Sequence, residues 1–239
     1  MRYLGLTLPS LAENLALDEA LLEEAEAAGR PLETLRLWEA REHAVVIGRS
    51  SRIAAEVRGD VCRDPHLPVL RRISGGAAVV VGPGCQMYAV VLSLRLRPQL
   101  RSIDQAHAQV LGTIATALQP SVPGLTFRGI CDLTIGEKKV SGNSVRIKRE
   151  HLLYHGTLLY DFLLEMIGRY LAMPPRQPDY RQARPHDAFV TNVPLDTATL
   201  RAALQTAWAA FEPCSDWPQA ATQRLVAEKY SQPKWNEQL

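Results

Sequence analysis

The chain has 239 residues, of which 46% are hydrophobic and 22% charged, and its formal net charge is +2. This composition excludes a disordered chain and predicts a folded domain with a sizeable core. The small net charge, without any block of like charges, indicates no nucleic-acid partner. No apolar run reaches membrane-spanning length and the N-terminus lacks a secretory signal pattern, so we expect a cytoplasmic protein with no membrane partner.

The four cysteines, Cys62, Cys85, Cys131 and Cys214, are widely spaced along the chain. No two of them form a Cys-x-x-Cys pair, which argues against a structural zinc site and against a disulfide framework. We therefore expect all four to carry free thiols.

The first half of the chain mixes one helix with several short strands. Ser10 and Glu13 have the spacing of a capping box and open an amphipathic helix that is expected to end near Gly29. Strands are predicted at residues 35–38, 44–48, 77–81 and 88–94. The segment Gly82-Pro83-Gly84 separates the last two strands, so a tight turn and a hairpin are expected there.

The second half continues this mixture. Ser102 and Gln105 open another helix, and residues 126–160 are predicted to form strands around a glycine-rich centre. Three aspartates are candidate N-caps of the remaining helices, the last two near 197–211 and 218–230: Asp161, Asp196 and Asp216.

The proline-rich stretch 172–195 shows no helical or strand period. It is predicted to be a long surface loop, and loops of this length in compact domains are often functional. Because hairpins occur among the helices, the whole pattern predicts one domain over residues 1–239, of the α+β or mixed α/β class.

The segment Arg71-Arg72-Ile73-Ser74-Gly75-Gly76, followed by an apolar strand, is the most informative motif. A glycine backbone can approach an anion closely with its N–H groups, and arginines add planar, charge-assisted donors. The motif therefore favours a cradle for a phosphate or an acyl-phosphate. A glycine pair in an ordinary hairpin turn would give part of the same pattern.

A second motif runs from Cys131 to Arg146. If Gly136 lies at the turn of a hairpin, Asp132 and Lys139 come close together. A carboxylate that holds Mg²⁺ and a lysine that neutralises phosphate charge suit adenylyl or acyl transfer. An exposed ion pair on a solvated hairpin would give the same residues.

The third motif is His155-Gly156, inside the apolar stretch 152–160. A histidine in such a strand is suited to a hydrogen-bonded core position as well as to acid–base chemistry.

Taken together, three motifs resemble the lipoate–protein ligase A family, within the biotin/lipoate ligase and octanoyltransferase superfamily. They are Arg71-Arg72-x-Ser74-Gly75-Gly76-x-Ala78-Val79, Lys139-Val140-Ser141-Gly142-Asn143 and His155-Gly156-Thr157-Leu158-Leu159. The resemblance extends from Asn14 to Trp235. It implies the catalytic-domain fold of that superfamily, a central mixed β-sheet flanked by helices.

The resemblance also implies an activity. Ligases of this family use MgATP to convert lipoate to lipoyl-adenylate, and then transfer the acyl group to a lysine of a lipoyl carrier domain. The carrier belongs to a 2-oxoacid dehydrogenase E2 or to the glycine-cleavage H protein. The expected cofactors are therefore ATP and Mg²⁺, with lipoate or octanoate as substrate.

Residue roles follow from the motifs. The resemblance makes Lys139 the catalytic cation, in contact with the acyl carbonyl and the α-phosphate, and Asp132 the candidate Mg²⁺ ligand. The residues expected to bind lipoate or adenylate are Arg71, Ser74, Gly75, Gly76, Ala78, Asp132, Ser141, Gly142, Arg146, His155 and Gly156. Strands around Val79 and Leu159 are expected to enclose the acyl chain, at about 0.8 kcal/mol per buried methylene.

The chain departs from the family pattern at three points. Ala77 stands where a third glycine is common, and Tyr154 where a first histidine is common. The sequence ends at Leu239, so we expect the C-terminal accessory domain of known ligases to be absent. A separate accessory-domain protein, adenylation without that domain, or another reaction would each account for this.

The other reaction is an ATP-independent octanoyl or lipoyl transfer with Cys131 as acyl-thioester nucleophile. Lys139 nearby would lower the pKa of the Cys131 thiol, whereas a small buried hydrophobe is the alternative role for this cysteine. A non-catalytic lipoyl-binding subunit is a third hypothesis. The residues do not separate lipoate from octanoate, and they do not identify the carrier protein or the oligomeric state.

Overall fold

The computed structural model describes residues 1–59 and 67–238, so Cys62 lies outside the described residues. The strands are β1 (Arg2–Leu4), β2 (Thr34–Glu39), β3 (Ala44–Ile47), β4 (Val69–Arg71), β5 (Val79–Val81), β6 (Cys85–Ser93), β7 (Leu125–Arg128), β8 (Asp132–Ile135), β9 (Lys138–Ile147), β10 (His151–Leu159) and β11 (Glu212–Pro213). The helices are α1 (Leu11–Ala27), α2 (Ile53–Glu56), α3 (Ile103–Leu118), α4 (Glu165–Tyr170), α5 (His186–Phe189), α6 (Thr197–Ala207), α7 (Gln219–Leu225) and α8 (Pro233–Asn236).

Within the described residues the strands form two sheets. The larger has the order β11-β1-β2-β6-β10-β9-β8-β7, and the smaller has the order β4-β3-β5. β1 runs parallel to both of its neighbours, while β2, β6, β10, β9, β8 and β7 pair in antiparallel fashion. This mixed sheet with flanking helices confirms the predicted fold class.

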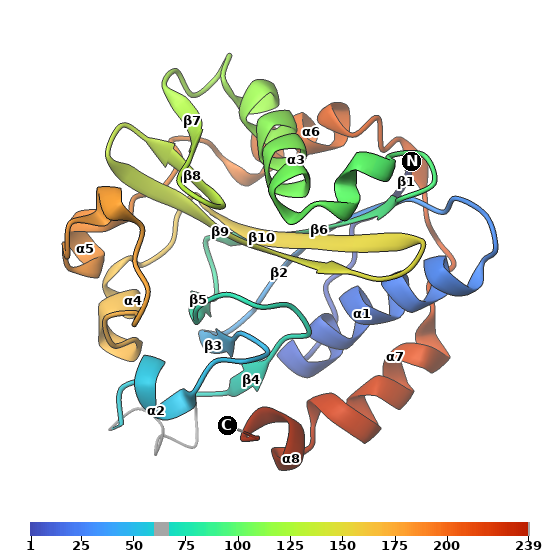
Figure 1. Cartoon of the computed structure of the whole chain (residues 1–239), viewed down its shortest axis with the longest axis horizontal. Helices are drawn as coiled ribbons and strands as arrows, with labels where there is room; N and C mark the ends of the chain where they lie inside the picture. Colours follow the sequence, from blue (N-terminus) through green and yellow to red (C-terminus); the bar gives the residue numbers. More distant parts are fainter. Residues whose placement is uncertain (60–66, 239) are drawn as a thin grey trace.

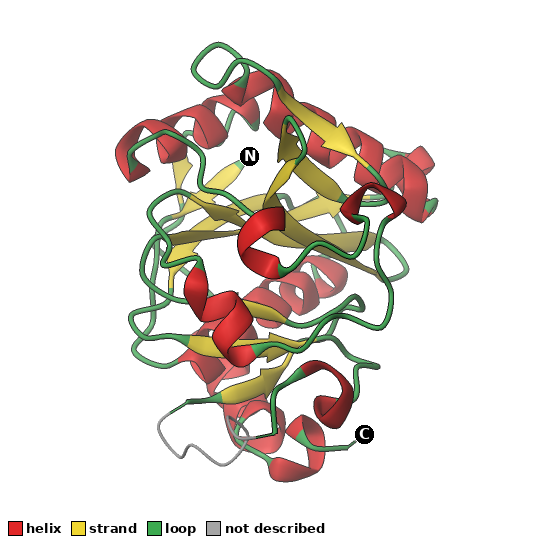
Figure 2. Ribbon diagram, turned by 90° about the vertical axis from the view of Figure 1, so that its left-hand side faces the viewer, coloured by secondary structure: helices red, strands yellow, loops and turns green. Residues whose placement is uncertain are grey.

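The larger sheet divides the molecule into two layers (Figures 1 and 2). Helices α3 and α6 cover one face, and α1, α7 and the smaller sheet lie on the other. Because side chains alternate along a strand, Met87 and Ala89 of β6 join the core beneath α1, while Tyr88 and Val90 join the core beneath α3. The same alternation sends His155 of β10 towards α1 and its neighbour Tyr154 towards α3.

Several predicted elements are confirmed. The capping box at Ser10 and Glu13 is formed in both directions and starts α1, which ends two residues before Gly29. The side chain of Ser102 caps α3, and residues 126–160 form the strands β7 to β10. The side chain of Asp196 accepts a hydrogen bond from the backbone of Thr199 and caps α6.

The predicted hairpin between residues 77–81 and 88–94 is wrong. β5 pairs with β3 in the smaller sheet, whereas β6 lies between β2 and β10 in the larger one. The turn Gly82-Pro83-Gly84 therefore carries the chain from one sheet to the other. Gly84 has φ +81°, and a Cβ at this position would lie 2.1 Å from the carbonyl oxygen of Asp161.

The other departures concern helix starts and the proline-rich stretch. α4 begins at Glu165 and α7 after Pro218, both without a side-chain cap, so Asp161 and Asp216 are not N-caps. The stretch 172–195 is not a bare surface loop, because it contains a short 3₁₀ turn and α5. Its buried side chains include Phe189 and Val193, and tertiary packing rather than local sequence order holds it in place.

No helix in residues 1–59 and 67–238 is long and apolar enough to cross a membrane. Among the described cysteines, Cys85, Cys131 and Cys214 are free thiols, as predicted.

We predict that Gly84→Ala destabilises the protein more than Gly124→Ala. Both glycines have positive φ, +81° and +84°, but no atom lies within 4 Å of a Cβ at Gly124. Gly124→Ala is the control. It should lower the free energy of unfolding by about 1 kcal/mol, because only the backbone conformation is strained. Gly84→Ala should lower it by about 1–3 kcal/mol more, because its Cβ also clashes. Urea unfolding of both variants measures this difference, and equal losses would contradict the proposed close approach.

Candidate active site

A cleft opens between the two sheets, where β9 and β10 face the loop of residues 72–79. Its larger part, which we call the open part, has a volume of about 690 Å³, and a narrower part of about 150 Å³, which we call the enclosed branch, extends beneath the stretch 172–190. Both parts are lined by Glu56, Ala77, Ala78, Val79, Lys139, Gly142, Thr157, Arg176 and Pro178.

Arg72 holds the loop of residues 72–79, which we call the glycine loop, through hydrogen bonds to its backbone. Its buried guanidinium donates hydrogen bonds to the carbonyls of Val46, Gly75 and Ala77. Burial lowers the pKa of Arg72 to about 10, which still leaves it protonated near neutral pH. Arg72 binds the carbonyl of Gly75 and Ser51 binds that of Gly76, so the N–H groups in the same two peptide groups, those of Gly76 and Ala77, point the other way and remain available to a ligand. Within residues 1–59 and 67–238, the exposed N–H groups of residues 75–77 have no hydrogen-bond acceptor.

Arg71 does not line the cleft, contrary to expectation. Its side chain is fully buried and donates to the carbonyls of Gly48, Ser51 and Asn236, among others. Adjacent residues at the end of a strand point to opposite sides, so only one of the two arginines can face the loop. Arg71 therefore links β4 and the turn after β3 to the C-terminal residues.

The hairpin expected at Gly136 is formed. Gly136 has φ +56° at the turn between β8 and β9, and Lys139 Nζ lies 2.5 Å from Asp132 Oδ1. The second carboxylate oxygen of Asp132 accepts a hydrogen bond of 2.6 Å from the hydroxyl of Tyr180. Asp132 is nearly buried, while the Lys139 side chain is 28% exposed and faces both parts of the cleft.

The cleft has carboxylates that could bind a metal ion together with the phosphates of a bound nucleotide. Among residues 1–59 and 67–238, no group of three or more His, Cys, Asp or Glu side chains could hold a metal ion. Mg²⁺, however, is commonly bound by one or two carboxylates together with substrate phosphates. Asp132 offers one such carboxylate, whose oxygens each keep a lone pair beside their contacts with Lys139 and Tyr180, and Glu56 is a second carboxylate in the cleft that accepts the N–H of Ala78. This donor set fits nucleotide-bound Mg²⁺.

Cys131 lines the open part of the cleft, but its thiol is not activated. Its Sγ donates a 3.4 Å hydrogen bond to the carbonyl of Asn143. Burial raises the pKa of the Cys131 thiol, and the nearby cations of Lys139 and Arg72 only partly oppose this. A raised pKa leaves less thiolate, which is the nucleophilic form, so the environment does not favour the role of nucleophile.

His155 contacts the glycine loop through its side chain. Its Nε2 lies 2.5 Å from Ser74 Oγ, and both residues are buried. The next residue must be glycine, because a Cβ at Gly156 would lie 2.0 Å from Asn143 Oδ1. Tyr154 lies on the other face of β10, where its hydroxyl is 2.8 Å from Nδ1 of the buried His107. Its replacement of a family histidine therefore does not alter the cleft.

The structure brings most of the predicted site residues together. Those that line the cleft are Gly76, Ala78, Cys131, Asp132, Lys139, Ser141, Gly142, His155 and Gly156. Ser74 and Gly75 lie in the loop at its edge, while Arg146, half-buried on β9 opposite Leu153, is not among the lining residues.

Further polar residues of the site were not predicted, and Glu56, Arg72, Asn143 and Tyr180 are four of them. Arg72 and Asn143 stand within the two motifs that carry the resemblance, so the sequence held a signal for them. Asn143 ties the site together, because its amide donates to the carbonyl of Cys131 and accepts from Tyr88 and Ser141. Glu56 and Tyr180 come from segments without any motif, and only the tertiary fold brings them in.

Comparison with known proteins identifies the family. The model of the lipoyl protein ligase A/B catalytic domain matches residues 10–205. The chain belongs to this family. A putative lipoate-protein ligase A from Aeropyrum pernix is 35% identical over 147 residues, which are 61% of this chain and 52% of that protein. The chain spans about half the length of the curated relatives it matches.

Solved structures share the fold over the whole chain. A bi-partite lipoate protein ligase from Thermoplasma acidophilum, described with its E2 lipoyl domain, superposes with a TM-score of 0.79 at 23% identity and covers 99% of this chain and 95% of that one. A lipoate-protein ligase A bound with ATP gives a TM-score of 0.77 at 21% identity, over 99% and 98% of the two chains. At these identities the likeness shows the fold.

We predict that Cys131 reacts slowly with iodoacetamide near neutral pH, and more slowly still in Lys139→Gln. Burial raises the pKa of the thiol, and loss of the Lys139 cation raises it further, which lowers the thiolate fraction at a given pH. Mass spectrometry of the peptide that contains Cys131 gives the rate as a function of pH. Lys138→Gln on the same strand is the control and should leave the rate unchanged. An inflection below the pKa of a free cysteine would contradict this prediction.

Proposed function

We propose that the protein is a lipoate–protein ligase, which uses MgATP to form an acyl-adenylate from lipoate or octanoate. It then transfers the acyl group to a lysine of a lipoyl carrier domain. The observation that carries this proposal is the position of Lys139, which lines both parts of the cleft and contacts Asp132. A cation at this junction can contact an acyl carbonyl and a phosphate at the same time.

The two parts of the cleft suit the two halves of an acyl-adenylate. The inner wall of the open part includes Leu15, Val46 and Met87, which are buried and apolar and therefore suit an acyl chain. The enclosed branch includes Arg181 and His186 beside apolar walls, and its volume suits the base of a nucleotide whose phosphates lie towards Lys139. We therefore place the acyl chain in the open part; Leu159, which was expected beside it, lines only the enclosed branch.

The residues of the chain act on two steps. In the first, the substrate carboxylate attacks the α-phosphorus of ATP and pyrophosphate leaves; in the second, the carrier lysine attacks the acyl carbonyl and AMP leaves. Lys139 would stabilise the charge that develops on oxygen in both steps, and the amides of residues 75–77 would bind the same oxygens. Mg²⁺, which would neutralise phosphate charge, would be held by Asp132.

Two partners belong to the proposal. The acyl acceptor would be a lipoyl domain of the E2 type, such as the one described with the bi-partite ligase of similar fold, or one of the glycine-cleavage H type. A separate protein with an accessory domain would assist adenylation, because the similar ligase is bi-partite.

We predict that purified protein adds a lipoyl group to an E2 lipoyl domain only when MgATP is present. The accessory protein of a bi-partite ligase is added in a parallel arm, and mass spectrometry reads the acceptor. Lys139→Ala should lower the rate by about 100-fold or more, because it removes transition-state charge stabilisation. Lys138→Ala, an exposed neighbour on β9, is the matched control.

Two outcomes would reject the ligase. Acceptor modification from octanoyl-carrier protein without ATP, with a thioester on Cys131, would establish the transferase instead. Lipoate binding without any transfer in either arm would favour a non-catalytic lipoyl-binding subunit.

We predict opposite effects for two substitutions that fill the two parts of the cleft. Met87→Phe should raise KM for lipoate and leave KM for ATP nearly unchanged, because Met87 lines only the open part. Ile167→Phe should do the reverse, because Ile167 lines only the enclosed branch. Steady-state kinetics with each substrate varied in turn separates the effects. The reverse pattern would move the acyl chain to the enclosed branch.

A further inference from the structure

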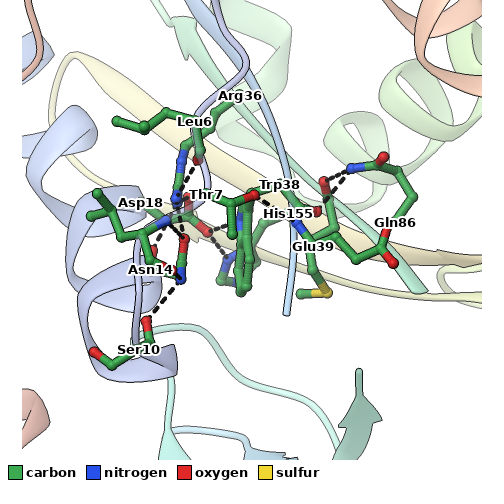
Figure 3. A network of polar contacts seen from close by, with 12 residues as sticks. Leu6, Thr7, Ser10, Asn14, Asp18, Arg36, Trp38, Glu39, Gln86 and His155 are labelled. Carbon is green, nitrogen blue, oxygen red and sulfur yellow. Dashed lines mark hydrogen bonds and ion pairs between the residues drawn. The ribbon is translucent and has the colours of Figure 1, made fainter. Parts of the chain in front are cut away.

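A buried polar network connects helix α1 to the cleft (Figure 3). At its centre is Asp18, whose side chain is almost completely buried. Asp18 Oδ1 lies 2.5 Å from Nη1 of the buried Arg36, and Oδ2 accepts a 3.3 Å hydrogen bond from Trp38 Nε1. The same Oδ2 lies 4.0 Å from Nδ1 of His155, which lines the open part of the cleft.

The carboxylate of Asp18 faces the Nδ1 side of the His155 imidazole. At 4.0 Å the contact is too long for a hydrogen bond, but Oδ2 is the carboxylate oxygen that is not bound to Arg36, and its negative charge acts on the imidazole. A negative charge beside Nδ1 favours the tautomer with the proton on Nδ1. In that tautomer Nε2 has no proton and can only accept a hydrogen bond.

Ser74 supplies that hydrogen bond. Its Oγ lies 2.5 Å from His155 Nε2 and also accepts a 3.2 Å hydrogen bond from Arg72 Nε. In the Nδ1–H tautomer of His155 the hydroxyl proton of Ser74 is donated to Nε2. Ser74 is only 1% exposed, so its hydroxyl is a structural donor at the start of the glycine loop and not a nucleophile.

We propose that Asp18 is a positioning residue of the acyl-adenylate site. It holds His155 in the Nδ1–H tautomer, His155 accepts the hydroxyl proton of Ser74, and this bond fixes the loop that presents the amides of residues 75–77. Nothing in residues 10–18 marks Asp18 as part of a site, because it lies one layer behind the cleft on α1. The kinetic consequence of this inference rests on the proposed ligase function, whereas the tautomer of His155 does not.

The first test compares Asp18→Asn with Glu19→Gln. Glu19 is the adjacent buried carboxylate of α1, but it binds Lys229 and Tyr230 and does not contact His155. We expect Asp18→Asn to lower the rate of lipoyl-adenylate formation by about 10- to 100-fold, because small displacements of a positioned group have effects of this size. Glu19→Gln should change the rate by less than about threefold at a matched folded fraction. Equal losses in both variants would overturn the proposal.

The second test reads the tautomer directly and needs no activity. In protein labelled with ¹⁵N-histidine, the His155 signals are assigned by their loss in His155→Gln. We expect the Nδ1–H tautomer in the wild type, and a shift towards the Nε2–H tautomer in Asp18→Asn. An Nε2–H tautomer in the wild type would overturn the proposal even if the protein is an active ligase.

Ser74→Ala keeps the proposal testable if Asp18→Asn leaves Arg36 unpaired and does not fold. Loss of the hydroxyl donor should lower the rate of adenylate formation by about 10-fold, and the tautomer of His155 should remain Nδ1–H. If both variants fold, the double variant should lose no more rate than the worse single one, because the two residues act through one hydrogen bond. If the rate losses of the two single variants multiply in the double variant, Asp18 and Ser74 act independently and the proposal is rejected. An inactive wild type would remove the ligase function and leave the tautomer result standing.

Discussion

Two adjacent arginines, Arg71 and Arg72, hold the cleft together by binding backbone carbonyls rather than acidic side chains. Arg72 gathers the carbonyls of the glycine loop, and Arg71 gathers those of the turn after β3 and of the C-terminal residues. A peptide group that turns its carbonyl inwards directs its N–H the other way. The loop therefore presents donors to the cleft because the acceptors are already occupied behind it.

This arrangement requires arginine. A guanidinium has five donors in a fixed plane, and Arg71 uses them on carbonyls from segments far apart in the sequence. A lysine at either position would reach fewer carbonyls and leave others buried without a partner, at about 1–3 kcal/mol each. Burial lowers the pKa of both arginines. The negative charge of Glu56 raises the pKa of both and so partly opposes this effect.

The predictions from sequence succeeded where the cause is local. The Ser10 capping box, the turn at Gly136 and the approach of Lys139 to Asp132 depend on residues within a few positions of one another. The predicted hairpin at Gly82-Pro83-Gly84 failed, because the same turn residues can join two strands of one sheet or of two different sheets. Sequence spacing does not distinguish these cases; the contact between Gly84 and the backbone at Asp161 does.

The site shows the same division. The three motifs located most of the lining residues, because the family pattern is carried by strands that remain adjacent. Arg71 was misplaced, because a motif does not state which of two neighbouring side chains faces the ligand. Tyr180 was missed, because the stretch 172–195 has no period and reaches Asp132 only through tertiary packing, including the hydrogen bond from Thr191 to the carbonyl of Lys139.

The ties between Arg71 and the C-terminal residues also bear on how the cleft comes into existence. Arg71 and Asn236 are 165 positions apart, and Asn236 accepts hydrogen bonds from both the backbone N–H and the guanidinium of Arg71, at the end of the strand before the glycine loop. A ribosome releases the N-terminal segments first, so α1 and the strands can begin to assemble while this anchor is still missing. The segment before the binding loop can therefore acquire these hydrogen bonds only after translation has delivered Asn236, long after the loop itself has been synthesised.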